Sequence, residues 1–476
     1  MSKGSGSVFL SGRLQSARSV ALAVLIQSVE SGEGVDLLLD RALDHSSLDK
    51  RDRALMMELT YGVLRRQGTI DWRLTPVLDK PMRRLPVMVQ MLLRMATYQL
   101  LFLDRIPPSA AVNESVRLAK AATKTLGRDW SGFVNAVLRS LIREPVPPWP
   151  SVDDDPTAAL AVRYSVPEWL SRRWIDRLGI RAAEASCEQA GTIPPVTIRV
   201  NRLRTTRDEF LGRLIEAGVN AISTIVSPWG IVLKDCGAIR SLPGFEEGMF
   251  YVEDEGAQMI PLVLDPRPGE AVLDACAAPG GKATHLAEIM SDNGLIYAVD
   301  RHKARVDLLK ANCRRLGINS VMPVVGDARR QCEWSVTEDD RGDARLPATF
   351  DRILVDAPCS GLGVLRRHPE SKWRKQDSSF ERHQLLQLEI LRSAAVSLRP
   401  GGTLVYSTCS TEPDENEIVI EKFLSTHGGF RRESAAPWLP AIARDHFLTP
   451  GGAYSTEGNL YSMDVFFAAR LRKRLA

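Results

Sequence analysis

The 476-residue sequence lacks several features that would place it in familiar classes. Its seven cysteines are scattered singly, without a CxxC pair or a histidine-rich partner, which argues against a disulfide framework and a structural zinc site. A Walker phosphate loop is missing, and the first apolar stretch, SVALAVLIQSV, is too short to span a membrane and lacks the flanks of a signal peptide. We therefore expect a cytoplasmic protein with free thiols, no bound metal and no membrane association.

Length and charge set the next limits. A chain of 476 residues exceeds what one compact core usually holds, so we expect several domains. Hydrophobic residues make up 44% and charged residues 25%, as in an ordinary folded protein. The net charge is +4, but residues 1–150 hold 21 Lys and Arg against 14 Asp and Glu, a surplus of 7. A solvated helical surface and a phosphate-facing surface both explain such a surplus.

The spacing of apolar residues divides the chain into segments. In residues 1–145 they recur three and four positions apart, which predicts an all-helical bundle. Residues 146–160 are rich in proline and acid and are expected to be a linker. Residues 161–262 show helical spacing and then the pattern of strand, helix, strand and strand, which indicates a small α+β unit.

The last segment, residues 263–476, alternates apolar strands with helices. Its strands are AVLDACA, GLIYAVD, VMPVVGDA, FDRILVDAP and GTLVYSTC, and each is apolar over nearly its whole length. Strands of this kind are buried on both faces, so they predict a parallel sheet in a doubly wound, Rossmann-like α/β domain. The expected fold class is therefore multidomain, combining an all-α bundle, a small α+β segment and this α/β domain.

In a parallel sheet of this type, ligands bind beyond the carboxyl ends of the strands. The first strand ends at Asp274, the second at Asp300, placed to accept ribose hydroxyls, and the third at Asp327, placed to accept from an adenine amino group. After Asp274 comes a loop that a ligand could approach closely, made of Cys276, Ala277, Ala278, Pro279, Gly280, Gly281 and Lys282. The structural alternatives are a purely steric need for glycine, a helix cap at Asp300 and a turn at Asp327. Together these residues favour an adenosine-containing cofactor without a phosphate clamp, S-adenosylmethionine rather than ATP or NAD.

Two cysteines follow the fourth and fifth strands. Cys359 lies in the loop after Asp356, and Cys409 ends the fifth strand, GTLVYSTC. Both cysteines should therefore emerge at the same edge of the sheet. A cysteine is commonly a small buried hydrophobe, but these two sit past their apolar runs among small polar residues, where a substrate could reach a thiolate. A transient redox pair is the rival interpretation.

These residues carry a resemblance to a known family. The segments DACAAPGGKATHLAEI, VDRHKARVDLLKANCRRLG, FDRILVDAPCSGLGVLRRHPESKW and GGTLVYSTCSTEPDENE resemble those of the Sun family of RNA cytosine-5 methyltransferases. The helical segments RDRALMMELTYGVLRRQGTIDWRL and GFVNAVLRSL are similar to the NusB-like domain fused to the family members that act on bacterial 16S ribosomal RNA. PPVTIRVNRLRTT is similar to the start of their ferredoxin-like segment.

The resemblance implies roles for individual residues. It assigns the cofactor loop to residues 276–282, the ribose-binding acid to Asp300 and the adenine-side acid to Asp327. It places Asp356 near both the cofactor methyl group and the target base. Cys409 matches the nucleophile, and Cys359 matches the cysteine required for release of the product. The implied cofactor is S-adenosylmethionine and the implied partner is 16S ribosomal RNA in the small-subunit precursor, bound by a monomer that takes neither DNA nor membrane.

The chemistry explains why a thiol is needed. Carbon 5 of cytosine is too electron-poor to attack a methyl sulfonium, but a thiolate that adds to carbon 6 makes carbon 5 nucleophilic. We expect positive charge such as that of Lys282 near the sulfur, because a free thiol is mostly protonated at neutral pH. Asp356 could support the N3 side of the ring if burial raises its pKa. Chemistry alone leaves the attacking thiol open, since Pro358-Cys359 also fits the DNA enzymes, and the resemblance favours Cys409.

RNA contacts are expected directly after the Cys359 loop. A target base must be unstacked from its neighbours, which calls for phosphate-pairing charge and a stacking ring. The candidates are Arg366, Arg367, Lys372, Trp373 and Arg374, and a solvated basic loop is the alternative.

Three functions compete at this stage. The first is methylation of carbon 5 of a cytosine in 16S ribosomal RNA. The second is a non-catalytic RNA-binding or ribosome assembly factor that keeps the methyltransferase fold as a scaffold, against which the intact strand-end acids and both cysteines count. The third, a small-molecule or DNA methyltransferase, is disfavoured by the helical RNA-type domain and the second cysteine.

Overall fold

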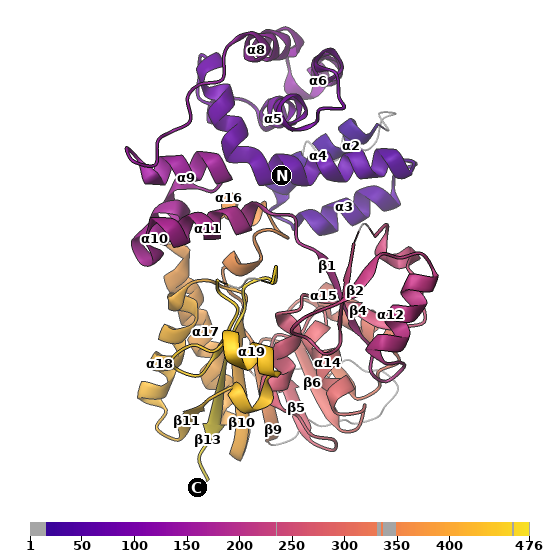
Figure 1. Ribbon diagram of the computed structural model, residues 1–476, viewed down its shortest axis with the longest axis vertical. Coiled ribbons are helices and arrows are strands. Elements are labelled where there is room, and N and C mark those ends of the chain that lie inside the picture. Colours follow the sequence, from indigo (N-terminus) through magenta and orange to yellow (C-terminus); the bar gives the residue numbers. More distant parts are fainter. Residues whose placement is uncertain (1–15, 235, 331–334, 337–348, 459–460, 476) are drawn as a thin grey trace. The chain divides into compact units, whose positions relative to one another are not determined.

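The computed structural model describes residues 16–234, 236–330, 335–336, 349–458 and 461–475 (Figure 1). The chain forms two compact units. The first comprises Met1–Ile193 together with Leu365–Asp377, and the second comprises Pro194–Val364 together with Ser378–Ala476. A short stretch from the C-terminal half of the sequence thus belongs with the N-terminal helices.

The first unit is helical, as the apolar spacing predicts. Ser16 starts it with a capping box, and Gly32, at φ 71°, ends the first helix in a left-handed turn. Its core is built from apolar side chains of several helices, among them Leu22, Leu59 and Leu92. The helices are α2 (Ala17–Ser31), α3 (Val35–Asp44), α4 (Lys50–Leu74), α5 (Val87–Phe102), α6 (Pro108–Ala121), α7 (Thr123–Leu126), α8 (Ser131–Arg143), α9 (Pro156–Tyr164), α10 (Glu168–Leu178), α11 (Ile180–Gly191) and α16 (Ser371–Arg374). Helix α9 begins at Pro156, within the stretch that the composition suggested as a linker.

The second unit begins with a small antiparallel sheet in the strand order β2-β3-β1-β4. Its elements are β1 (Val196–Val200), α12 (Arg207–Glu216), β2 (Ala221–Ser223), β3 (Gly230–Leu233) and β4 (Phe250–Val252). Phe210 and Leu214 of α12 pack with Ile198 and Phe250 of the sheet in one core. This is the predicted α+β segment, with the short strand β2 in addition.

The remainder of the second unit is a mixed sheet in the order β11-β13-β10-β9-β5-β6-β7-β8, with β12 paired to β13. Its strands are β5 (Ala271–Asp274), β6 (Leu295–Asp300), β7 (Val321–Val325), β8 (Ser335–Val336), β9 (Phe350–Asp356), β10 (Leu398–Thr408), β11 (Phe430–Glu433), β12 (Tyr454–Ser455) and β13 (Phe467–Lys473). The five strands expected from the sequence form the parallel centre, from β10 to β7. The outer strands β8, β11 and β13 run antiparallel to their neighbours and were not anticipated.

Both faces of this sheet are covered, which explains the apolar strands. Along β5, Val272 packs into one hydrophobic cluster and its neighbour Leu273 into another. The first cluster holds Leu286 of α14 (Gly281–Ile289) and the second holds Leu391 of α17 (Ser379–Val396). The other helices of this unit are α13 (Ile260–Leu264), α15 (Lys303–Leu316), α18 (Glu417–Thr426) and α19 (Ala441–His446). The doubly wound architecture follows from this alternation.

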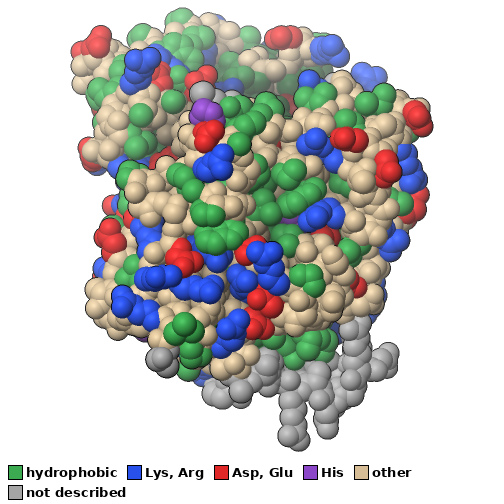
Figure 2. Space-filling model, turned by 60° about the horizontal axis from the view of Figure 1, so that its bottom comes forward, with side chains coloured by type: hydrophobic (Ala, Val, Ile, Leu, Met, Phe, Trp, Pro, Cys, Tyr) green, Lys and Arg blue, Asp and Glu red, His purple; other side chains and the backbone are tan. Residues whose placement is uncertain are grey.

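Two surface properties bear on function. Among the described residues, none of the helices combines the length and apolarity needed to cross a membrane. Figure 2 shows one face of the molecule, on which Lys and Arg side chains are interspersed with Asp and Glu side chains. Ion pairs such as Arg399 with Asp351, at 2.6 Å, join opposite charges on the surface of the second unit.

Candidate active site

Two cysteine-bearing loops leave the sheet side by side. Strands β9 and β10 are parallel neighbours, and their register pairs Asp356 with Ser407, so both strands end at the same edge. Cys359 Sγ lies 3.5 Å from Cys409 Sγ. Both cysteines are partly exposed and both are free thiols, since a disulfide would require about 2 Å between the sulfurs. The structure thus brings together the two thiols that the strand pattern singled out.

Asp356, the last residue of β9, joins a cation to the two strand ends. Its Oδ2 accepts a hydrogen bond from Lys282 Nζ at 2.7 Å, and its Oδ1 accepts one from Ser407 Oγ at 2.8 Å. Burial disfavours the ammonium, but the charge and the hydrogen bond of Asp356, with smaller contributions from Glu253 and Cys409, together outweigh burial and raise the pKa of Lys282. A permanent cation therefore lies within electrostatic reach of the Cys409 sulfur.

This pairing corrects one condition attached to Asp356. In the sequence analysis, Asp356 supports the N3 side of the cytosine ring on the condition that burial raises its pKa. Its side chain is 28% exposed and ion-paired with Lys282. Both of its oxygens already accept hydrogen bonds, one from Lys282 and one from Ser407, and the deep burial that this condition needs is not present.

The two cysteines differ in their surroundings. The hydrogen bond with Cys409 raises the pKa of Cys359, and burial and the nearby charge of Glu415 add to the effect. Cys359 is therefore held as a thiol at neutral pH. Lys282 contributes positive charge near Cys409, and Glu415 contributes negative charge near Cys359. The electrostatic surroundings of the two sulfurs therefore differ.

The loop between β5 and α14 is built from small residues for steric reasons. Gly280 has φ 110°, a conformation that L side chains rarely adopt. A side chain added at Gly281 would place its Cβ 3.0 Å from Glu253 Oε1. The steric alternative for these glycines therefore holds, and it is compatible with a ligand approaching the same backbone.

Asp274, which opens this loop, is an unusual carboxyl group. It is fully buried, and neither of its oxygens has a hydrogen-bond partner. Burial and, to a smaller extent, the charge of Asp356 raise its pKa to about 7. A buried carboxyl group without a partner is costly, so Asp274 indicates a ligand that supplies a donor or positive charge.

Asp300 and Asp327 lie at the ends of the next two strands and are already engaged. Asp300 Oδ1 accepts from the backbone N–H of His302 at 2.9 Å, and its Oδ2 lies 3.2 Å from Arg305 Nη1. His302, and not Asp300, is the N-cap of α15, so the cap alternative for Asp300 is wrong. Hydrogen bonds from the Arg329 side chain lower the pKa of Asp327 to about 2. Asp327 also accepts from the Arg329 backbone N–H, which is the turn role considered for it.

These strand-end acids fit the expected cofactor. Asp274, Asp300 and Asp356 are the last residues of β5, β6 and β9, Asp327 follows the end of the adjacent strand β7 by two residues, and Asp274 is the one of the four whose oxygens have no partner. Carboxylates at this edge accept hydrogen bonds from ribose hydroxyls, an adenine amino group or an ammonium, and they attract a sulfonium. The residues present thus suit S-adenosylmethionine.

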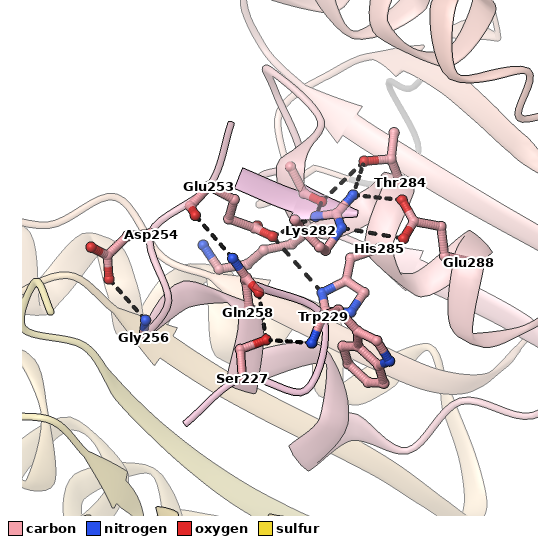
Figure 3. Close-up of polar contacts among 12 residues, drawn as sticks. Ser227, Trp229, Glu253, Asp254, Gly256, Gln258, Lys282, Thr284, His285 and Glu288 are labelled. Carbon is pink, nitrogen blue, oxygen red and sulfur yellow. Dashed lines mark hydrogen bonds and ion pairs between the residues drawn. The ribbon is translucent and has the colours of Figure 1, made fainter. Parts of the chain in front are cut away.

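A buried arginine from β1 fastens the first turn of α14. Arg199 is fully buried and donates to the Gly281 carbonyl at 2.9 Å, to Thr284 Oγ1 at 3.0 Å and to Glu288 Oε1 at 2.8 Å. It also donates to Glu253, and Figure 3 shows two of its partners, Thr284 and Glu288, next to each other on α14. The α+β segment thereby holds the helix that carries Lys282.

The expected RNA contacts after the Cys359 loop require correction. Lys372 is fully buried, and its Nζ donates to the Arg65 carbonyl at 3.2 Å. Burial, helped by the charges of Arg65 and Arg66, lowers its pKa to about 7. Trp373 donates its indole N–H to the Leu64 carbonyl at 2.9 Å. Lys372 is packed inside the helical unit, so its predicted phosphate contact is wrong, whereas Trp373 is partly exposed and its stacking role stays a prediction.

The arginines of the same segment differ in their exposure and in their partners. Arg366 is 4% exposed, too buried for a phosphate contact. Arg374 is exposed, but its guanidinium donates to the carbonyls of Gly32, at 2.9 Å, and Glu33, at 3.0 Å, and is committed to the helical unit. Arg367 is partly exposed and stays a proposed RNA contact. Charge spacing alone did not separate a solvated basic loop from one that anchors a segment.

Sequence reasoning missed the residues that join the loops to one another. Glu415 is fully buried and contacts the residues that follow both cysteines, Ser360 and Ser410. Arg199 lies in the strand β1 between apolar residues, and the sequence analysis gave it no role. The sequence does place Glu415 only six residues after Cys409. It lies there in an acidic stretch, which is usually exposed, so its burial could not be foreseen.

Comparisons with known proteins identify the family of the chain. Residues 261–472 match the family described as 16S rRNA methyltransferase RsmB/F, residues 15–143 match the NusB family, and residues 166–240 match the ferredoxin-like domain of RsmF/B-like methyltransferases. The chain is 36% identical over 460 residues to the probable ribosomal RNA small subunit methyltransferase B of Bacillus subtilis, covering 96% of this chain and 99% of the relative. It is 36% identical over 461 residues to the ribosomal RNA small subunit methyltransferase B of Escherichia coli O1:K1, covering 96% and 98%.

Solved structures show the same architecture. The protein PH0851 superposes with a TM-score of 0.79 at 28% identity, over 95% of this chain and 98% of that one. A methyltransferase homolog protein from Pyrococcus horikoshii superposes with a TM-score of 0.55 at 28% identity, over 67% of this chain and 99% of that one.

The family matched over the sheet domain and the full-length relatives identify the chain as a small-subunit rRNA methyltransferase. The chain belongs to the 16S rRNA methyltransferase RsmB/F family.

Proposed function

We propose that this protein methylates carbon 5 of a cytosine in 16S ribosomal RNA through a temporary bond between Cys409 and carbon 6. The observation that carries the proposal is the pair of sulfurs 3.5 Å apart beside the Lys282–Asp356 ion pair. One thiol can add to the ring while the other takes part in ending the adduct. The names of the relatives, which refer to the small ribosomal subunit, support the choice of RNA.

The cofactor loop, Asp274, Asp300 and Asp327 would hold S-adenosylmethionine, which supplies an electrophilic methyl group when bound. Asp300 suits the ribose hydroxyls and Asp327 the adenine amino group, because both are carboxylates at adjacent strand ends. Asp274 suits a positively charged or hydrogen-donating part of the cofactor, because its buried oxygens have no partner in the protein.

The first step uses Cys409 and Lys282. The thiolate of Cys409 forms a bond to carbon 6, and the electron pair of the ring double bond moves to carbon 5, which then accepts the methyl group. The Lys282 cation stabilises the thiolate before the attack. Asp356, as a carboxylate, accepts a hydrogen bond from the exocyclic amino group of the base and so orients the ring.

The last step uses Cys359. The proton on carbon 5 passes to the Cys359 sulfur as Cys359 gives up its own proton, the electron pair of that C–H bond re-forms the ring double bond, and the bond between carbon 6 and Cys409 breaks with its electron pair going to the Cys409 sulfur. Cys359, a thiol held 3.5 Å from Cys409 Sγ, can donate a proton to the departing sulfur. Attack and release are thus divided between two cysteines.

Mapping 5-methylcytosine in 16S ribosomal RNA tests the proposal. In a deletion strain, one site should lose its methyl group, and the intact gene should restore it while a Cys409→Ala gene should not. Restoration by the Cys409→Ala gene would contradict the proposal, because it would leave the chain as a non-catalytic assembly factor. An unchanged methylation map would contradict it as well.

A further inference from the structure

One buried carboxylate links the two cysteine loops. Glu415 lies at the end of a short 3-10 turn, Pro413–Glu415, six residues after Cys409, and its side chain has no exposure to solvent. Its Oε1 accepts the backbone N–H of Ser360 at 2.7 Å. Its Oε2 accepts both the hydroxyl of Ser360 and the hydroxyl of Ser410. A single side chain is thus bonded to the residue that follows each cysteine.

The same contact is reinforced from both sides. The hydroxyls of Ser360 and Ser410 are themselves 3.2 Å apart. Gln387 of α17 donates to the Pro358 carbonyl at 3.1 Å and to Glu415 at 3.4 Å. Because Pro358 and Ser360 flank Cys359, the backbone on both sides of this cysteine is fixed through Glu415 and its neighbour.

Glu415 holds these donors as a charged group. Burial alone would raise its pKa, but hydrogen bonding with His383, Ser360 and Ser410 outweighs burial and lowers the pKa. His383 Nδ1 lies 3.1 Å from Glu415 Oε1. A carboxylate accepts four hydrogen bonds at once without offering a donor, which an amide or a hydroxyl cannot do.

We propose that Glu415 is a positioning residue that ties the Cys359 loop to the Cys409 loop and sets the sulfur spacing needed to release the methylated base. The role rests on the proposed function, since it concerns the step in which Cys359 ends the adduct on Cys409. Attack needs only Cys409 and Lys282, so loss of Glu415 should impair release more than attack.

The first test is the fate of the covalent protein–RNA complex. Glu415→Gln keeps the size of the side chain but offers an amide N–H₂ where two donors already converge. We expect methyl transfer turnover to fall on the order of 10–100-fold. We also expect covalent complex to accumulate on denaturing gels, as in Cys359→Ala, with cofactor affinity unchanged. Glu421→Gln, the same change at an exposed position of α18, is the matched control and should behave as the unaltered protein.

The second test needs no RNA. Phenylarsine oxide bonds to two neighbouring thiols at once, forming two As–S bonds while the oxygen and both thiol protons leave as water. The unaltered protein should bind it at the Cys359 and Cys409 pair, and Cys359→Ala should not. Glu415→Gln should bind it on the order of 10-fold more weakly, because the second sulfur is no longer held in place.

The outcomes separate the two proposals. Normal turnover together with unaltered arsenical affinity in Glu415→Gln would overturn the role of Glu415. Absence of a trapped complex in Cys359→Ala would overturn the proposed function, while the arsenical measurement would still decide the role of Glu415. If Glu415→Gln unfolds, the Ser360→Ala and Ser410→Ala double variant removes the two hydroxyl contacts and keeps the carboxylate and its bond to the Ser360 backbone, and it is required to show slower release and weaker arsenical binding than the unaltered protein.

Discussion

Replacement of Arg199 by Met should destabilise the second unit strongly. The change removes the guanidinium that neutralises Glu253 and Glu288, and both carboxyl groups stay buried. Removing one partner of a buried ion pair costs about 3–5 kcal/mol, because the charge left behind is uncompensated. Such a loss is a large fraction of the total stability of a domain, about 5–15 kcal/mol.

The assay is urea unfolding of the full chain, with cofactor affinity measured at low urea. We expect a lower midpoint and weaker cofactor binding, because Arg199 also holds the Gly281 carbonyl at the start of α14. Arg202→Met is the matched control. Arg202 is exposed, and its guanidinium lies 4.6 Å from the ring of Trp229, a contact worth about 0.5–1 kcal/mol.

A compensating variant makes this prediction sharper. Combining Arg199→Met with Glu253→Gln and Glu288→Gln removes the buried charges together, so most of the lost stability should return. Cofactor binding should remain weak, since the tie to Gly281 is still absent. A loss below about 1 kcal/mol in Arg199→Met, or a triple variant no more stable than the single one, would refute the reasoning.

Two further predictions concern buried ionisable groups. The pKa of Asp274, raised to about 7, means that the folded protein keeps a proton that the unfolded chain loses near pH 4, so stability falls as pH rises through this window. Asp274→Asn should therefore raise the free energy of unfolding on the order of 2–4 kcal/mol more at pH 8 than at pH 4, measured by urea unfolding, and an equal effect at both values would contradict it. The pKa of Lys372 is lowered to about 7, so the free-energy cost of burying its charge is full below pH 7 and absent above about pH 10.5. Lys372→Met should stabilise the protein more at pH 6.5 than at pH 9.5 and leave the salt dependence of RNA binding unchanged, whereas a shallower salt dependence would show that Lys372 contacts phosphate.

The sheet was predictable because burial on both faces leaves a clear trace in the sequence. Val272 and Leu273 point to opposite faces and are both apolar, as only a covered strand requires. Once the strands were placed, the position of Cys359 beside Cys409 followed from parallel strand order, although 50 residues separate them. The strands β8, with two residues, and β11, with four, are too short to give a clear pattern, whereas β13 has seven residues, five of them buried, and was not identified.

Contacts between distant segments were not predictable in the same way. Glu415 and Ser360 are 55 positions apart, and Arg199 and Glu288 are 89 apart, and neither pair has a local pattern that names its partner. Lys372 is the clearest failure. A lysine in a basic loop is usually solvated, and only tertiary packing against the Arg65 carbonyl shows that this one is buried.

The central claim is that Cys409 bonds to the base and Cys359 ends that bond. The direct measurement incubates each cysteine variant with cofactor and 16S ribosomal RNA and separates the products on a denaturing gel. Cys359→Ala should accumulate covalent protein–RNA complex, and Cys409→Ala should give neither complex nor methylated RNA. A complex that persists in Cys409→Ala and is absent in Cys359→Ala would contradict the account.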